Sequence, residues 1–518
     1  MKYLLLTVLM TQCVNYLSCT ENNVVDPEKC KIYGPGLKAD KIVMPARYFY
    51  IESYNEDGER INKSPEDIFK VEISGVSNIG ECRIWTETLD RHDGSFIIRY
   101  KVYNTCFNLK IEINYKNKAV ANSPYTITGS VHSETCYCPT PKFSKWLKEY
   151  ECTDYEYPQI LEDLEPFPTV NFTEFRTATI KRFDRPGSVS ICNYVIKNNQ
   201  VHRRCYGEHV GFKMFWDNIL LSLSRKVRLP DVELLVNLGD WPLVFKDKEF
   251  KELHTPMLSW CGSEETADIV VPTYDITEAS LECMGRVTLD MLSIQGRTSV
   301  AWEEREPKAF WRGRDSRRER LDLIKIAREN PDLFNASLTN FFFFRDEEKI
   351  YGPKEKHVSF FEFFKYKYQL NLDGTVAAYR FPYLLAGGSL VLKQESQYYE
   401  HFYKQLIPGE HYVPFARDLS DLVTQIQWAM DHDEEAQRIA RKGKNFARDN
   451  LAPQSIFCYH ARLLNEWSKR LVSPVKVRKQ MELVPQPEVD VKYGTCNCEI
   501  LQKDEVKPKE KTTKKDEL

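Results

Sequence analysis

The stretch Ala309–Arg320 reads Ala-Phe-Trp-Arg-Gly-Arg-Asp-Ser-Arg-Arg-Glu-Arg, and its order of residue types indicates how the larger part of the chain folds. The aromatic start favours a buried strand, the Arg-Gly pair ends that strand, and a helix is expected to begin near Ser316. Five of the nine residues from 312 to 320 are arginines. Guanidinium groups and free backbone N–H groups at a helix N-terminus together bind anions. The stretch therefore predicts an anion site after a strand, with Arg314 and Arg320 as ligands. Arg317 and Arg318 are expected to be exposed on the helix.

A second stretch, Asn371–Arg380, follows the same plan with the sequence Asn-Leu-Asp-Gly-Thr-Val-Ala-Ala-Tyr-Arg. Gly374 permits close backbone approach, and small residues are expected to open a helix that carries Arg380 on its first turns. Taken alone, such a helix start is equally often structural. Two anion sites in one region favour a nucleoside diphosphate, without a metal or other cofactor because no Asp-x-Asp motif accompanies them. The second site would consist of Thr375, Val376, Ala377, Ala378, Tyr379 and Arg380.

The candidate base is Asp240, in the motif Gly239-Asp240-Trp241-Pro242. A buried strand, Val232–Val236, runs directly into this motif. Because ligands of open α/β sheets bind at the carboxyl ends of strands, Asp240 is expected at the edge of a cleft. Partial desolvation beside Trp241 would raise the basicity of the carboxylate and suit a general base. The alternative is an Asx turn in which Asp240 only ends the strand.

The chain from 136 to 475 alternates short apolar strands with helical stretches, which indicates α/β layers with largely parallel sheets. This length suits two Rossmann-like halves, 136–295 on an acceptor side and 296–475 on a nucleotide side, with a cleft between them. Predicted strands are Val232–Asn237, Ile269–Pro272 and Phe341–Phe344. Predicted helices are Phe212–Ser224, Arg317–Glu329 and Leu419–Met430.

Residues 28–130 show a different pattern, with apolar and polar residues alternating in period two between turn clusters. They predict an immunoglobulin-like β-sandwich that Cys82 and Cys106 could join. The expected strands are Ala46–Ser53, Phe69–Ile73, Ser95–Val102, Leu109–Tyr115 and Tyr125–Thr128. The fold class is thus multidomain, a β-sandwich followed by an α/β region.

Composition excludes several classes of protein. The 518 residues carry 72 Lys+Arg against 75 Asp+Glu, a net charge of −3, which argues against a nucleic-acid partner. A hydrophobic content of 42% with 28% charged residues is ordinary for a globular chain and excludes disorder over most of its length.

The two ends of the chain predict its compartment. Residues 1–20 have the form of a secretory signal peptide, too short in its apolar run to span a membrane. The chain ends in Lys515-Asp516-Glu517-Leu518, a retention signal of the endoplasmic reticulum that the KDEL receptor binds. Residues 476–518 are rich in Pro and Lys and are expected to be a flexible tail. We therefore expect a protein of the endoplasmic reticulum lumen, without membrane insertion and monomeric.

The cysteines agree with an oxidising compartment. Of 15 Cys, 13 remain after the signal peptide, so at least one is unpaired within the chain. The C-x-C pairs at Cys136/Cys138 and Cys496/Cys498 favour disulfides over metal binding. Glycosylation sequons begin at Asn62, Asn171 and Asn335.

Several motifs together resemble a known family. Gly34-Pro35-Gly36-Leu37, Asp93-Gly94-Ser95-Phe96 and Ser123-Pro124-Tyr125 resemble a filamin-type repeat. The motifs around Asp240, Arg314 and Arg380, in this order, resemble the protein O-glucosyltransferases of glycosyltransferase family 90, specifically those with a filamin-type module and a C-terminal KDEL signal. Further matching segments are Gly207–Phe212, Ser259–Ser263 and Lys365–Tyr368.

The resemblance implies a GT-B architecture, UDP-glucose as donor and inverting transfer to serine of folded EGF-like repeats. It makes Asp240 the catalytic base, with Arg314, Arg320 and residues 375–380 as UDP-sugar contacts. It assigns the acceptor side to Trp241, Pro272, Thr273, Tyr274 and Asp275. It also implies a disulfide between Cys136 and Cys458, with Cys152 close to Cys138. The partners of Cys30, Cys192, Cys205, Cys261, Cys283, Cys496 and Cys498 are left open.

The sequence leaves two alternatives open, one for the donor sugar and one for the class of protein. The donor sugar could be xylose from UDP-xylose, since the absence of one CH₂OH group leaves the motifs unchanged. The chain could also be a non-catalytic binding or chaperone protein that acts through its filamin-type module. Intact Asp240, Arg320 and Arg380 argue against the second alternative.

Overall fold

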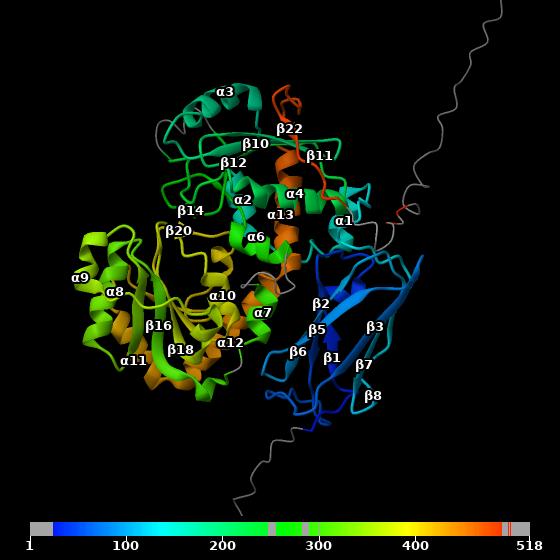
Figure 1. The fold of residues 1–518 in the computed structure, drawn as a ribbon, viewed down its shortest axis with the longest axis vertical. Helices are drawn as coiled ribbons and strands as arrows, with labels where there is room; N and C mark the ends of the chain where they lie inside the picture. Colours follow the sequence, from blue (N-terminus) through cyan, green and yellow to red (C-terminus); the bar gives the residue numbers. More distant parts are fainter. Residues whose placement is uncertain are drawn as a thin grey trace, which may run out of the picture.

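The computed structural model describes residues 24–246, 255–281, 290–298, 300–488, 496 and 498. It contains an N-terminal β-sandwich module and two α/β halves (Figure 1). The predicted signal peptide, the KDEL motif and Cys283 lie outside the described residues. No described helix is both long and apolar enough to span a bilayer.

The module is a sandwich of two antiparallel sheets. One has the order β1-β2-β6-β5 and the other β4-β3-β7-β8, with β9 paired to β7. The strands that the sequence predicted are present, and the Cys82–Cys106 disulfide is confirmed. Their bounds are β1 Lys31–Tyr33, β2 Arg47–Glu52, β3 Lys70–Ser77, β4 Gly80–Glu81, β5 Ile84–Asp90, β6 Ser95–Val102, β7 Phe107–Tyr115, β8 Lys118–Ala119 and β9 Tyr125–Ile127.

The two sheets of the module differ in burial. Along β3 exposed and half-buried residues alternate, as expected when one face meets solvent. Along β2 nearly every residue is buried, because Phe49 and Ile51 enter the module's own core while Tyr48 and Tyr50 join the core of the first α/β half. The β1-β2-β6-β5 sheet is therefore covered on both faces, and the module is packed against the rest of the chain.

The first half contains a mixed sheet of order β15-β13-β12-β10-β11-β22. The prediction of a largely parallel sheet is wrong here, because only β12, β13 and β15 run parallel. β10 and β11 form a hairpin whose turn residues Asn198 and Asn199 both have positive φ, as a two-residue turn requires. The bounds are β10 Ile191–Lys197, β11 Gln200–Tyr206, β12 Val232–Asn237, β13 Leu258–Ser259, β15 Ile269–Val270, β22 Glu482–Leu483, α1 Phe143–Glu149, α2 Pro158–Leu164, α3 Phe172–Phe183, α4 Lys213–Lys226, α6 Tyr274–Leu281 and α7 Met291–Gly296.

The second half contains a wholly parallel sheet of order β17-β16-β18-β19-β21. Helices α8 and α11 begin one and three residues after their predicted starts. The bounds are β16 Glu306–Arg314, β17 Phe334–Asn340, β18 Tyr366–Asn371, β19 Leu390–Gln394, β21 Val413–Phe415, α8 Arg318–Glu329, α9 Glu348–Tyr351, α10 Phe381–Ala386, α11 Leu422–Asp431 and α12 Asp433–Asn450.

The predicted strand Phe341–Phe344 is wrong, because the strand of this region is β17, which ends at Asn340. The backbone N–H groups of Phe342, Phe343 and Phe344 instead donate to the buried carboxylate of Asp315, over 2.6–2.9 Å. An apolar run thus forms a turn around an acidic side chain from the neighbouring strand end.

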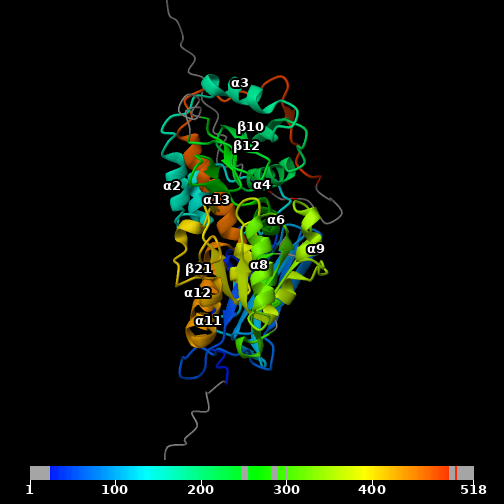
Figure 2. The same cartoon turned by 90° about the vertical axis from the view of Figure 1, so that its left-hand side faces the viewer.

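The chain returns to the first half after α12. Helix α13, Pro453–Ser468, packs in the core of that half (Figures 1 and 2), so the first half includes residues beyond the predicted limit of 295. Residues 476–488 are not the flexible tail that the sequence predicted. Arg478 pairs with buried Glu233 at 2.7 Å, β22 adds to the sheet, and Cys496 and Cys498 are bonded to the first half.

The disulfides correct the predicted pairing. Cys136 bonds Cys496 instead of Cys458, and Cys138 bonds Cys498. Cys458, on α13, bonds Cys152, and Cys192 bonds Cys205 across the β10–β11 hairpin. Cys30 and Cys261 are free. The two C-x-C segments therefore pair with each other.

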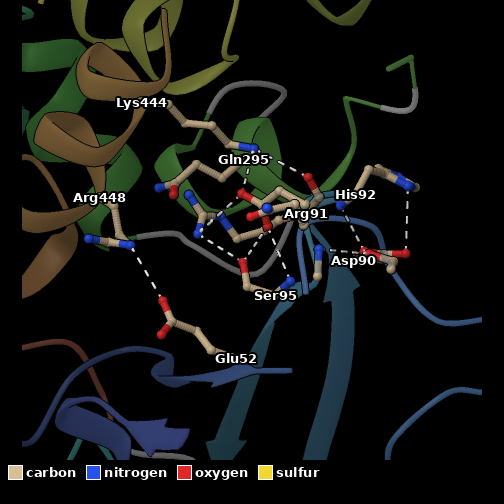
Figure 3. A network of polar contacts seen from close by, with 12 residues as sticks. Glu52, Asp90, Arg91, His92, Ser95, Gln295, Lys444 and Arg448 are labelled. Carbon is tan, nitrogen blue, oxygen red and sulfur yellow. Dashed lines mark hydrogen bonds and ion pairs between the residues drawn. The ribbon is translucent and has the colours of Figure 1, made fainter. Parts of the chain in front are cut away.

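The module is fixed by buried polar contacts. Arg99 of β6 and Asp290 have fully buried side chains 3.5 Å apart, and Asp290 also caps α7 by accepting from two of its backbone N–H groups. Figure 3 shows Lys444 and Arg448 of α12 reaching the same module; Lys444 donates to the carbonyl of Arg91 at 3.2 Å. The module also contacts the first half, where Tyr150 donates to the carbonyl of Val43. It thus braces both halves.

We expect Arg99→Met to lower the free energy of unfolding by about 3 kcal/mol, because it leaves the Asp290 carboxylate buried without its cation. The matched control is Lys110→Met, which removes a half-exposed ion pair with Glu112 on the outer sheet and should cost less than about 1 kcal/mol. Denaturant unfolding measures both. Equal losses of unfolding free energy in Arg99→Met and Lys110→Met would contradict the conclusion that buried polar contacts fix the module to the α/β halves.

Candidate functional site

The two halves meet where the three predicted motifs lie. A two-stranded sheet pairs β14, Gly262–Ser263, of the first half with β20, Tyr398–Tyr399, of the second. Beside it, buried Cys261 of the first half packs with Val376 and Ala377 of the second. This contact brings the Asp240 loop next to the 371–380 segment.

The loop that carries Asp240 is shaped by a neighbouring asparagine. β12 ends at Asn237, whose side chain accepts from the Gly239 N–H at 2.8 Å and donates to the Trp241 carbonyl at 2.6 Å. A Cβ at Gly239 would lie 2.6 Å from a methyl group of Val189, so a larger residue here would displace that side chain. The Asx turn at this strand end therefore belongs to Asn237, and the alternative in which Asp240 itself forms it is excluded.

The same loop is held further on by buried Asp268. Its carboxylate accepts from the backbone N–H groups of Leu243 and Val244 and from the Ser259 hydroxyl, over 2.5–3.0 Å. Burial raises the pKa of Asp268 to about 6. Asn237 and Asp268 were not identified from the sequence, although both lie at strand ends.

The Asp240 carboxylate has the environment of a general base. Its Oδ1 is buried and makes no hydrogen bond within the described part of the chain. Burial raises the pKa of Asp240, and the charge of Arg314 opposes the shift. A carboxylate with an uncommitted oxygen and raised basicity can accept a proton from a hydroxyl group.

The two arginine motifs converge on one edge of the parallel sheet. β16 and β18 are parallel neighbours, so their carboxyl ends lie together. Arg320 of α8 spans both ends: it donates to the carbonyl of Arg314 at 3.0 Å, of Leu372 at 3.1 Å and of Asp373 at 2.7 Å. Burial lowers the pKa of Arg320 to about 9. Arg320 therefore ties the two loops together.

Two other arginines have donors left for an anion. Arg380 is the N-cap of α10, not a residue of its first turns, and donates to the Arg312 carbonyl at 2.6 Å. Burial lowers the pKa of Arg380 to about 10. Arg314 is exposed, and its guanidinium forms no hydrogen bond with any described residue. The side chains of Val376, Ala377 and Ala378 are buried, so that segment offers a ligand mainly its backbone and Thr375.

The predicted acceptor side is aromatic. Tyr274, at the start of α6, contacts the rings of Phe212, Phe215, Trp260 and Tyr379. Pro272 and Thr273 are buried beneath it, and Asp275 is exposed. Trp241 is 47% exposed and Phe245 48% exposed. An apolar surface therefore adjoins the Asp240 carboxylate.

Other predicted sites stand apart from this cleft. No group of three or more metal-ligating side chains occurs among the described residues. Of the sequons, Asn62 is exposed and Asn171 caps α3. Asn335 lies within β17, where its amide contacts Arg312 at 2.7 Å and Tyr366 at 2.8 Å. That amide is already committed inside the protein.

Comparisons with known proteins show the family to which the chain belongs. Residues 147–515 match glycosyl transferase family 90, and residues 24–126 match the filamin/ABP280 repeat. The sequence is 51% identical to protein O-glucosyltransferase 2 of Danio rerio, over 91% of this chain and 92% of the relative. It is 48% identical to protein O-glucosyltransferase 3 of Homo sapiens, over 92% and 93%. A solved structure, Anabaena HepE with UDP-glucose, has 12% identity and a TM-score of 0.25 over 33% of this chain and 51% of its own, too low to carry an argument.

We expect Arg314→Ala to weaken UDP binding roughly tenfold or more, since a charge-assisted hydrogen bond contributes about 1.5–3 kcal/mol. Stability should be unchanged because Arg314 is exposed. The matched control is Arg318→Ala, which removes an exposed arginine of the same stretch that pairs with Glu347. Calorimetry with UDP measures both. Equal affinity of Arg314→Ala and Arg318→Ala for UDP would mean that the phosphates of UDP do not bind at Arg314.

Proposed function

The chain belongs to glycosyltransferase family 90, and from this premise we propose that it transfers glucose from UDP-glucose to serine in folded EGF-like repeats. The observation that carries the proposal is the Asp240 carboxylate, whose Oδ1 makes no hydrogen bond to any described residue, beside an edge lined by Arg314, Arg320 and Arg380. The relatives named protein O-glucosyltransferases support a protein acceptor and a glucosyl group.

The proposed reaction is a single inverting displacement. The serine oxygen attacks the anomeric carbon of glucose, Asp240 takes the serine proton, and the bond from that carbon to the phosphate oxygen breaks. UDP departs with the bonding electron pair, and its negative charge meets Arg314 and Arg380 while Arg320 holds the two loops in place. Fixed positive groups at the leaving phosphate lower the barrier electrostatically. Attack opposite the leaving group converts an α-glucoside into a β-glucoside.

The proposed architecture is GT-B, with the acceptor against the first half and the donor against the second. The exposed side chains of Trp241 and Phe245 support docking of a protein surface beside Asp240, because exposed aromatic groups are enriched at protein interfaces. The disulfides support an oxidising compartment, which agrees with a location in the endoplasmic reticulum lumen and retention by the KDEL receptor.

The direct test is incubation of a purified folded EGF-like repeat with the full-length chain and either UDP-glucose or UDP-xylose, followed by mass spectrometry. Gain of one hexose on serine is expected with UDP-glucose. Gain of a pentose only would change the donor, and no gain with either sugar nucleotide would contradict the proposed function.

Asp240→Asn should fold and bind UDP but transfer roughly 10²–10⁴ times more slowly, because it lacks the general base. Because burial raises the pKa of Asp240, the acid limb of the wild-type rate profile should lie at higher pH than the titration of an ordinary aspartate, with activity rising as the carboxyl group loses its proton. Asp275→Asn tests the neighbouring rival base, because local desolvation raises the pKa of the Asp275 carboxyl to about 6, and it should lose less activity than Asp240→Asn. Normal turnover by Asp240→Asn, or an equal loss in Asp275→Asn, would contradict the assignment.

We also expect transfer to be independent of divalent metal, because neither of the stretches 309–320 and 371–380 contains an Asp-x-Asp motif and both supply arginines for the leaving diphosphate. Initial rates after chelation with EDTA should equal those of the untreated enzyme. Loss of activity that manganese restores would remove the proposed role of the arginines.

A further inference from the structure

We propose that Tyr379 is a positioning residue that couples occupancy of the donor site to the placement of Asp240 across the cleft. This proposal rests on the function proposed above. Tyr379 belongs to the second half and Asp240 to the first, and the Tyr379 hydroxyl donates to the backbone carbonyl of Asp240 at 3.3 Å.

The carbonyl of Asp240 is the point at which the two halves hold the base. It accepts from Tyr379 and, at 3.3 Å, from the thiol of buried Cys261 in the first half. The side chains of Asn237 and Asp268 fix the backbone on either side of Asp240, at residues 239, 241, 243 and 244. Tyr379 therefore supplies the contact from the donor half that orients the backbone carbonyl group of Asp240.

The type of contact preserves the chemistry of the base. A hydroxyl that donated to the Asp240 carboxylate would stabilise its charged form and reduce its basicity. Tyr379 instead donates to the main chain, and Oδ1 keeps its lone pairs for a substrate proton. The contact can thus fix position without lowering the pKa of the carboxylate.

Tyr379 is linked to the donor site by the chain itself. It directly precedes Arg380, which caps α10 and donates to the carbonyl of Arg312 at the end of β16. Its ring lies edge-on to Tyr274, with centroids 5.6 Å apart. Because adjacent residues share a peptide bond, a diphosphate that orders Arg380 also orders Tyr379. The donor loop and the base then become ordered together.

The first test uses UDP alone and hydrogen exchange of the full chain, and it does not require transfer. In the wild type, UDP should slow exchange in peptides covering 374–386 and also in those covering 238–245. In Tyr379→Phe the first protection should remain and the second should be lost. Protection of 238–245 that persists in Tyr379→Phe, or is missing in the wild type, would overturn the proposal whatever the acceptor is.

The second test separates positioning from donor binding. Tyr379→Phe should lower kcat about three- to tenfold, the loss of one hydrogen bond, and by reciprocity of the coupling the Kd for UDP should rise by no more than that factor. Tyr398→Phe is the matched control, because the hydroxyl of Tyr398 makes no hydrogen bond among the described residues of this cluster. Weaker UDP binding by Tyr379→Phe with an unchanged kcat would mean that Tyr379 contacts the donor instead of positioning Asp240. Equal values of kcat and Kd in Tyr379→Phe and Tyr398→Phe would mean that the Tyr379 side chain contributes only to packing. If the wild type binds UDP but transfers no sugar, the proposed function fails and hydrogen exchange alone decides the coupling.

Discussion

The parallel pairing of β16 with β18 is the constraint on which the site depends. It brings two strand ends to one edge of the sheet, where a single buried guanidinium, that of Arg320, bonds three carbonyl groups from both loops. Because those loops continue into α8 and α10, their positions set Arg314, Tyr379 and Arg380. The positions of the two arginine-bearing loops thus follow from the register between β16 and β18 and from the Arg320 side chain.

The first α/β half is stabilised by segments that return to it from later in the chain. Helix α13 and residues 476–488 return to the first half, and Cys498 is bonded to Cys138 there. In sequence, the second half therefore lies between two stretches of chain that both belong to the first half. The filamin-type module adds a third support, since its β1-β2-β6-β5 sheet gives one face to its own core and the other to the α/β region. The module is therefore packed as a structural part of the α/β region.

The sequence identifies those features that depend on local order. The place of Asp240 after a strand could be predicted because a buried strand ends just before it, and the places of the arginine motifs because each follows a strand. Asn237 and Asp268 could not, since their roles depend on loops brought together by β12, β13 and β15. The disulfide pairing failed for the same reason: only the return of the tail places Cys496 beside Cys136. The run Phe341–Phe344 has strand composition, but the carboxylate of Asp315 bends its backbone into a turn.

The central claim is that one cleft places a serine hydroxyl at Asp240 and a sugar diphosphate at the arginine edge. The most direct measurement is a crystal structure of Asp240→Asn with UDP-glucose and a folded EGF-like repeat. We expect the serine oxygen within about 2.6–3.2 Å of the residue 240 side chain and the diphosphate against Arg314 and Arg380. A serine hydroxyl directed at Asp275, or a diphosphate bound away from the β16 and β18 ends, would contradict it.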